Sequence, residues 1–212
     1  MSDNNAEKID RRQQLLDVAE RLFAQKGYEA VSIRDLASEA GVNVAMVSYY
    51  FGSKDKLFEA LIESKMPRTR ERLEELAASG LSPWEKLSQV IDMYAEKFFT
   101  GRAFHRVVMR EMSLQQRPEH VKLIAGYMER NMELIRGFIV EGQEKGMFRY
   151  VDVELTIATI FGSLSTIITN RLLVCMMTKE AEEIVYNEQF KNRFKNHLKA
   201  LLQAHLVIAG QT

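Results

Sequence analysis

The chain has 212 residues, of which 46% are hydrophobic, so it is long enough to bury the core of one large or two small domains. Its 29 Lys and Arg balance its 29 Asp and Glu, which excludes binding to nucleic acid through a high overall positive charge. The single cysteine excludes a disulfide framework, and the chain shows neither a secretory signal pattern nor the roughly 20 apolar residues of a membrane span, so we expect a cytoplasmic globular protein.

Apolar residues recur with the period of an α-helix along the N-terminal part of the chain. The pattern predicts four helices: residues 10–26, Ser32 to Glu39, one that begins at Asn43, and one from Ser53 through Ile62. Gly27 and Gly41 follow the first and second helices as breaks, and Pro67 bends or ends the fourth. Ser32, with Asp35 three residues later, is typical of a helix start.

Glycine, serine and proline collect in residues 77–83, which we interpret as a domain boundary. Beyond it the same period predicts helices near residues 83–99, 103–114, 118–145, 152–177 and 187–208. The expected fold is therefore all-α. An N-terminal domain of residues 1–62 is linked by its fourth helix, which continues as a connector to about residue 79, to a C-terminal helical domain of residues 80–212.

The stretch from Asn43 to Phe51 carries aromatic residues on both sides of a helix. At about 100° per residue, one side holds Asn43, Val44, Val47, Tyr50 and Phe51, and the other holds Ala45, Met46, Ser48 and Tyr49. Ala37 lets the preceding helix approach closely, and Gly41 permits a tight turn. We interpret this region as a helix-turn-helix.

The outer side of the third helix is short enough to lie in a DNA major groove about 12 Å wide. Ala45 and Met46 can contact thymine methyl groups, while Ser48 and the Tyr49 hydroxyl can bond to phosphates or base edges. Few of these side chains can make a bidentate base contact, so we expect DNA shape to contribute to recognition.

Phosphate contacts are expected where two of the helices begin. Ser53 and Lys54 combine free backbone amides with a positive charge, and Ser32 and Arg34 do the same at the second helix. A helix-turn-helix also occurs in proteins that never bind DNA, so that alternative stays open at this point.

Residues 15–62, LLDVAERLFAQKGYEAVSIRDLASEAGVNVAMVSYYFGSKDKLFEALI, resemble the DNA-binding domain of the TetR family of bacterial transcriptional regulators. The matching pieces are AxxLFxxxGY ending at Tyr28, Ser32-Ile33, LAxxAGV at residues 36–42, YYF at 49–51 and KDKL at 54–57. The resemblance implies that the third helix reads the groove, that Lys54 and the start of the second helix hold phosphates, and that a homodimer binds a near-palindromic operator in double-stranded DNA. The candidate DNA-binding residues are Ser32, Arg34, Val44, Ala45, Met46, Ser48, Tyr49, Tyr50 and Lys54.

This region departs from the family pattern in two ways. Ser48 and Tyr50 stand where the family often has tyrosine and histidine. Residues 1–62 also hold eight Lys and Arg against ten Asp and Glu, which is unusual for a nucleic-acid binder. Binding must then depend on where the charges lie.

In the TetR family the second part of the chain is a ligand-responsive dimer module. Residues 152–177 are apolar nearly all round and include small residues, and residues 187–208 place apolar side chains at heptad-like spacing. We expect the homodimer to form through these two helices.

Methionine and aromatic residues gather between residues 84 and 140. They indicate either a cavity for a small apolar or amphipathic inducer or plain core packing. The candidate ligand-binding residues are Tyr94, Phe98, Phe104, His105, Met109, Met128 and Met132.

Catalytic signatures are missing from the sequence. It has no HExxH pair, GxxxxGK[ST] loop, GxGxxG turn or GxSxG elbow, so we expect no enzyme, no cofactor and no metal site. The expected function is a repressor that a small ligand releases from a palindromic operator. Two alternatives stay open: a DNA-bound protein whose C-terminal domain engages a protein partner, and a scaffold or enzyme that has only retained the fold.

Overall fold

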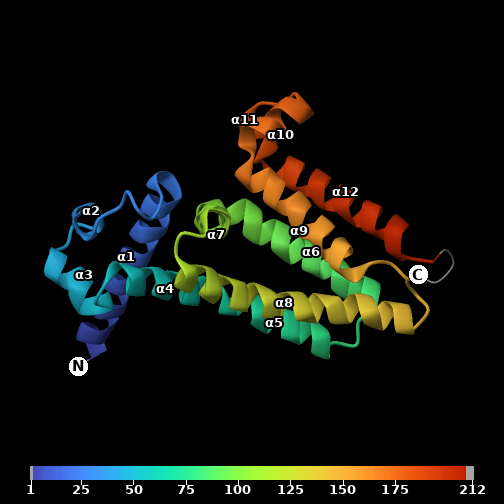
Figure 1. The fold of residues 1–212 in the computed structure, drawn as a ribbon, viewed down its shortest axis with the longest axis horizontal. Helices are drawn as coiled ribbons and strands as arrows, with labels where there is room; N and C mark the ends of the chain where they lie inside the picture. Colours follow the sequence, from blue (N-terminus) through green and yellow to red (C-terminus); the bar gives the residue numbers. More distant parts are fainter. Residues whose placement is uncertain (1, 209–212) are drawn as a thin grey trace. The chain divides into compact units, whose positions relative to one another are not determined.

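The computed structural model describes the backbone of residues 2–208, and the side chains from Arg11 onward except that of residue 168. All named elements of this part of the chain are helices, which confirms the predicted all-α fold (Figure 1). The chain divides into two compact units. The first runs to Pro67 and also includes Ala103–Ala125, and the second comprises Arg68–Arg102 and the chain from Gly126 onward.

The first unit contains the four N-terminal helices together with α7 and the start of α8. Their bounds are α1 (Ser2–Lys26), α2 (Ile33–Glu39), α3 (Val44–Phe51), α4 (Lys54–Lys65), α7 (Arg102–Leu114) and α8 (Pro118–Glu144). Helix α1 packs against α2 and α4, and α3 packs against both α2 and α4. No pattern along the sequence indicates that the α7–α8 corner folds back into this unit.

Local signals set the helix ends of the first unit as the sequence predicted. The Ser32 hydroxyl accepts a hydrogen bond from the Asp35 amide, and the carboxylate of Asp35 accepts one from the Ser32 amide. Asn43 and Ser53 cap α3 and α4 through the same kind of side-chain bond. Gly27 ends α1 with a φ of +85°, which a residue with a β-carbon rarely adopts.

The second unit contains α5 (Pro67–Ala78), α6 (Pro83–Thr100), the rest of α8, α9 (Val153–Thr169), α10 (Arg171–Thr178), α11 (Glu182–Val185) and α12 (Glu188–Leu206). Helix α6 packs against α9 and α12 (Figure 1). The core between these helices is formed by buried aliphatic and aromatic side chains, among them Leu87, Val90, Ile91, Ile135, Phe138, Ile139, Leu164, Leu198 and Leu202.

The prediction of one helix over residues 152–177 is wrong. The chain turns by 92° between α9 and α10, and Asn170 ends the first helix and begins the second. The Asn170 amide donates to the Thr166 carbonyl at the end of α9, and its side chain donates to the Thr169 hydroxyl at 3.2 Å and not to the backbone of α10. Apolar periodicity continues across the break, which is why the sequence pattern missed it. The short helix α11 was not predicted either.

No single described helix is long and apolar enough to cross a membrane; only the bent pair of α9 and α10, taken together, reaches that length and composition.

Candidate nucleic-acid interface

Helices α2 and α3 form a helix-turn-helix whose turn is held from behind by α1. Gly41 has a φ of +64°, and the Val42 amide donates to the Ala37 carbonyl at 2.9 Å. The Gln14 side chain of α1 donates to the Ala40 carbonyl at 3.1 Å. Because Val47 is buried in this arrangement, α3 has one fixed inner face.

The other face of α3 is open. Tyr49 is 69% exposed, and Ala45 and Ser48 are exposed beside it, as the sequence predicted. Val44, which the wheel placed on the inner side, is 40% exposed because it occupies the first position of the helix. This correction adds an apolar side chain to the outer face.

The remaining candidates on α3 are less exposed. Met46 and Tyr50 are half-buried. The Tyr50 ring lies edge-on to that of Tyr49 with centroids 5.4 Å apart, so it supports the exposed tyrosine. Phe51 is buried, and the guanidinium of Arg12 lies 5.2 Å from its ring centre.

At the start of α2, Ser32 is engaged within its own helix. Its hydroxyl donates to the Asp35 carboxylate at 2.6 Å in addition to the capping bonds. These bonds from Ser32 hold the pKa of Asp35 below its usual range. Arg34 is exposed next to it and offers a free-standing positive charge for a phosphate.

Lys54, the expected phosphate ligand at the start of α4, faces the protein in this structure. Its ammonium donates to the carbonyls of Tyr28 and Val31 at 3.1 and 2.9 Å and lies 4.1 Å from the centre of the Tyr28 ring. Burial lowers the pKa of Lys54, while the nearby carboxylates of Asp55 and Glu111 oppose that shift. The lysine therefore ties the start of α4 to the loop that precedes α2.

A polar cluster from the α7–α8 corner closes over the same loop. The Tyr28 hydroxyl donates to Asp55 at 2.5 Å, and burial raises the pKa of Tyr28. The two ring nitrogens of His120 lie 3.3 Å from Asp55 and 3.3 Å from Glu111. The His120 ring stacks on Phe58 with centroids 4.1 Å apart. His120 thus joins α8 to the first turn of α4.

Two arginines complete this corner. Arg117 pairs with Glu111 at 3.2 Å and with Glu29, and its guanidinium lies 4.2 Å from the centre of the Tyr28 ring, which is therefore contacted by two cations. The guanidinium of Arg110 lies against Gly27, where an added β-carbon would come within 2.6 Å of it. The sequence does not predict this corner, because its residues contact partners that lie 62 to 89 positions away along the chain.

The candidate ligand-binding residues are distributed over both units. Phe104, His105 and Met109 lie on α7 in the first unit, whereas Tyr94, Phe98, Met128 and Met132 lie on α6 and α8 in the second. Tyr94 and Phe98 are buried with ring centroids 5.8 Å apart, and Tyr94 is edge-on to Phe161 at 4.9 Å. Among the residues with described side chains, no three His, Cys, Asp or Glu are grouped to hold a metal ion.

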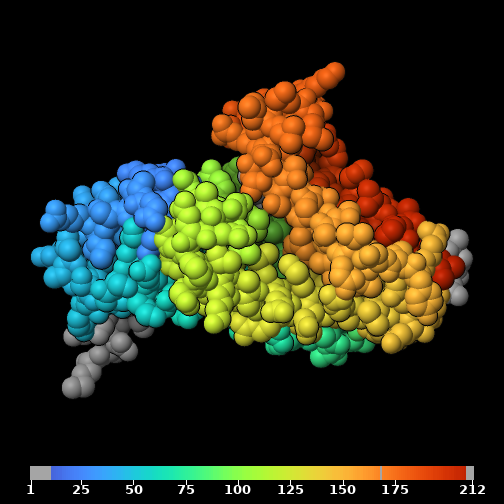
Figure 2. Space-filling view, in the orientation of Figure 1, coloured from blue at the N-terminus to red at the C-terminus, as the bar shows by residue number. Residues whose placement is uncertain are grey.

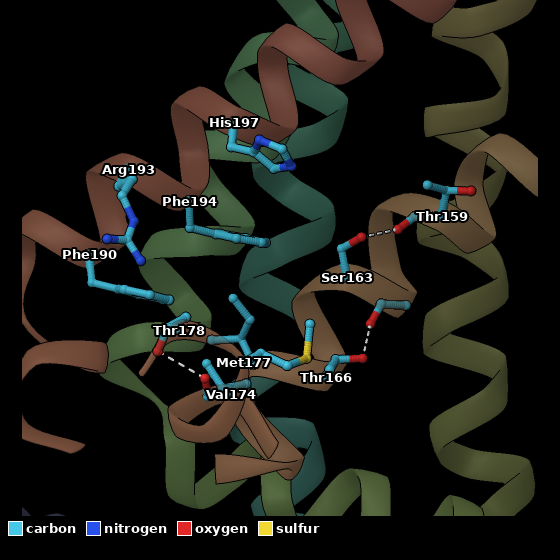
Figure 3. Close-up of a pocket in the computed structure, with 12 residues that line it drawn as sticks. Thr159, Ser163, Thr166, Val174, Met177, Thr178, Phe190, Arg193, Phe194 and His197 are labelled. Carbon is cyan, nitrogen blue, oxygen red and sulfur yellow. Dashed lines mark hydrogen bonds between the residues drawn. The ribbon is translucent and has the colours of Figure 1, made fainter. Parts of the chain in front are cut away.

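A groove of about 770 Å³ lies in the second unit between α9, α10 and α12 (Figure 3). Phe190 and Phe194 of α12 and Met177 of α10 give it an apolar lining, and Arg193 and His197 stand along the α12 side. The sequence does not predict this groove, because the groove depends on the bend between α9 and α10, which the prediction of one helix over residues 152–177 missed.

The hydroxyl groups that line this groove are already bonded within their own helices. Ser163 donates to the Thr159 carbonyl, and Thr166 donates to the Gly162 carbonyl, both at 2.8 Å (Figure 3). Thr178 likewise donates to Val174 at 2.9 Å. This side of α9 therefore presents small and largely apolar surface to whatever packs on it.

Large apolar side chains are exposed on α10 and α11, in the orange segment that projects from the second unit in Figure 2. They are Leu172, Leu173, Met176, Met177 and Ile184, exposed by 46% to 74%. A cluster of this kind is typical of a surface that binds another macromolecule.

Two family profiles match this chain. Residues 15–61 match the profile of bacterial regulatory proteins of the tetR family, and residues 80–169 match a tetracyclin repressor-like C-terminal domain. Together the matches cover more than half of the chain.

Several curated regulators are similar in sequence. The HTH-type transcriptional repressor KstR2 of Rhodococcus jostii is 26% identical over 155 residues, which is 73% of this chain and 76% of that protein. The fatty acid metabolism regulator protein of Bacillus subtilis is 26% identical over 167 residues, 77% of this chain and 84% of that protein.

Solved structures share the fold. KstR2 of Mycobacterium tuberculosis superimposes with a TM-score of 0.74 at 19% identity, covering 93% of this chain and 95% of its own. FadR from Bacillus subtilis in complex with stearoyl-CoA gives 0.69 at 24% identity, covering 90% and 96%.

Proposed function

The chain belongs to the TetR family of bacterial regulatory proteins, and we propose that it is a cytoplasmic, non-enzymatic repressor that leaves a palindromic DNA operator when a small apolar or amphipathic ligand binds. The observation that carries this proposal is the exposed face of α3, with Tyr49 at its centre, held by a helix-turn-helix on a rigid α1–α4 frame.

On DNA, α3 lies in the major groove. Ala45 and Val44 then contact apolar base edges, and Tyr49 contacts a base edge or a phosphate. Arg34 binds a phosphate at the start of α2, while Ser32 and Lys54 act mainly by shaping the two helix starts, since their polar groups are bonded within the unit.

The second unit forms the homodimer through α9, α10 and α12. The exposed apolar side chains of α10 and the small surface of α9 suit close packing of a second copy of the chain. A two-fold dimer then carries two α3 helices that fit major grooves about 34 Å apart. Ligand binding releases the operator only if the ligand prefers a dimer with a different separation of these helices.

The names of the similar proteins support an apolar ligand class: one is a fatty acid metabolism regulator, and another was solved with stearoyl-CoA. The same class suits the aromatic and methionine side chains of the second unit.

The test is selection of binding sites from a random DNA pool with the purified full-length protein at near-physiological salt. We expect the selected DNA sequences to contain an inverted repeat, because the dimer presents two identical α3 helices to the DNA. The Tyr49→Ala variant, whose fold is unaffected because the residue is exposed, is the control and should recover no repeat. A wild-type pool that remains random would refute the proposal.

A further inference from the structure

Lys97 differs from two buried lysines of the second unit in the partners of its ammonium group. The buried Lys86 pairs with Glu141 at 3.0 Å, and the buried Lys191 pairs with Glu96 and Glu188. Lys97, in the last turn of α6, has no carboxylate among the ion pairs of the described side chains, and its ammonium donates to the hydroxyl of Thr69 on α5. Thr69 itself is only 4% exposed.

This arrangement is unfavourable in the free protein. Burial lowers the pKa of Lys97 to about 8, and no nearby charge raises it. At neutral pH the group is still largely charged, so the folded protein carries a partly desolvated cation that a neutral hydroxyl compensates poorly. Side chains with strongly perturbed pKa values cluster at functional sites.

A second polar group without a full set of partners lies on α8. Asn131 is 6% exposed, and its side-chain oxygen accepts no hydrogen bond from the described protein atoms. The carboxamide does bond to the hydroxyl of Tyr94, which stands one turn before Lys97 on the same side of α6. Through Tyr94, the unused acceptor of Asn131 is therefore linked to the side of α6 that carries Lys97.

That junction is where α5, α6 and α8 meet within the second unit. Arg70, next to Thr69, donates to the Arg130 carbonyl at 3.0 Å and so holds α5 beside α8. The surrounding side chains are apolar: Leu73, Met93, Phe98, Met132 and Phe161 belong to the same core cluster. A single positive charge beside one hydroxyl and one amide suits a carboxylate, whereas a phosphate dianion usually has several cations.

We propose that Lys97, Thr69 and Asn131 form the head-group site of the regulatory ligand, and that this ligand is an amphipathic carboxylate whose chain packs among the aromatic and methionine side chains. The inference rests on the proposed ligand-released repressor and adds the chemical class of the ligand. Lys97 pairs with the carboxylate, and Asn131 accepts a hydrogen bond from a hydroxyl or amide of the ligand or from a bridging water.

The first experiment needs no ligand. Lys97→Met keeps the length of the side chain and removes the charge, and Lys145→Met, at an exposed residue that directly follows α8, is the matched control. Replacing a half-buried charge without a carboxylate partner should raise the Tm of the full-length protein by about 2–4 °C, and the control should stay within about 1 °C of wild type. A lowered Tm for Lys97→Met would mean that the lysine serves the fold, and would overturn the proposal.

The second experiment uses sodium decanoate and decan-1-ol as probes of equal chain length, measured by calorimetry and by the fluorescence of Trp84, the single tryptophan of the chain. We expect wild type and Lys145→Met to bind decanoate at least tenfold more tightly than the alcohol, and Lys97→Met to lose that preference. Equal binding of the two probes, no binding of decanoate, or a preference that survives in Lys97→Met would each overturn the carboxylate site.

Measurements of decanoate binding together with binding to the operator recovered by selection test this inference separately from the proposed function. If decanoate binds through Lys97 but leaves operator affinity unchanged, the site stands and ligand release fails. If the inverted repeat is recovered and decanoate does not bind, DNA recognition stands and the carboxylate class fails.

Discussion

Lys54 and Lys97 show that the role of a lysine depends on what its ammonium already contacts. The first donates to two backbone carbonyls, and the second donates to one hydroxyl. The sequence predicts that Lys54 holds a phosphate, and no sequence pattern distinguishes Lys97 from other lysines. The partners of both lie 23 to 28 residues away, so no local pattern reveals them.

Replacing Lys54 by Met tests whether it acts through the fold. We expect Lys54→Met to lower the Tm and to weaken binding to all DNA sequences, because the loop before α2 loses its anchor. The slope of log Kobs against log salt should stay unchanged, since no phosphate contact is lost. Lys56→Met, at an exposed neighbour paired with Glu59, is the control. A slope reduced by about one unit, with an unchanged Tm, would instead identify Lys54 as a phosphate ligand.

The pKa of Lys97 predicts how stability depends on pH. Burial lowers this pKa to about 8 from 10.5, so between these values the unfolded chain binds a proton that the folded chain lacks, and stability rises with pH. The destabilisation by Lys97 is complete below pH 8 and vanishes as pH approaches 10.5. In urea unfolding at pH 7 to 10, the stability advantage of Lys97→Met over wild type should therefore shrink. A constant advantage would contradict the assigned cause.

At the scale of helices, the sequence was most informative where the signal is local. The starts of α2, α3 and α4 were predicted because Ser32, Asn43 and Ser53 satisfy amides within three residues of themselves. The break at Asn170 was missed because apolar spacing continues through it. The α7–α8 corner was missed for a different reason: its position depends on contacts with Tyr28 and Asp55 that only the fold creates.

Removal of the Tyr28 hydroxyl tests how much the contacts of the α7–α8 corner contribute to the stability of the fold. Tyr28→Phe removes the hydrogen bond to Asp55 and leaves that carboxylate beside His120 with one partner fewer. We expect the free energy of unfolding to fall by about 1–3 kcal/mol, as for other bonds to charged groups. Tyr150→Phe, at a residue that is 86% exposed, is the matched control and should change it by less than about 0.5 kcal/mol. Equal effects would show that the bond contributes nothing.

For the whole molecule, net charge gives no indication of a nucleic-acid partner. Residues 1–62 are slightly acidic, yet several of their charges pair with each other, as Arg21 does with Glu39 at 2.7 Å, while Arg34 stands exposed beside α3. Helices of the predicted dimer region carry exposed apolar side chains, such as Leu172 and Met176 of α10. The groove between them could not be predicted, because it requires the bend at Asn170.

The exposed side chains of α10 give a test of assembly. Met176→Ser combined with Leu172→Ser should weaken dimerisation at least tenfold, because two large apolar side chains per subunit leave the interface. The Tm measured at low concentration should be unaffected, since both residues are exposed. Sedimentation equilibrium checks the prediction, with Tyr150→Ser as the control, and an unchanged association constant would exclude α10 from the interface.

The first unit is built from two separate stretches of the chain, and this affects how it folds during translation. Its four N-terminal helices are translated first, but Arg110, Glu111 and His120, which close over Tyr28 and Gly27, follow much later. At 5–20 residues per second, the ribosome takes roughly 3–12 s to reach Ala125 after Pro67. During this interval the four N-terminal helices lack the contacts of the α7–α8 corner, and they depend on chaperones or on their own marginal stability. A pause in translation before residue 125 should therefore raise the degradation of the nascent chain.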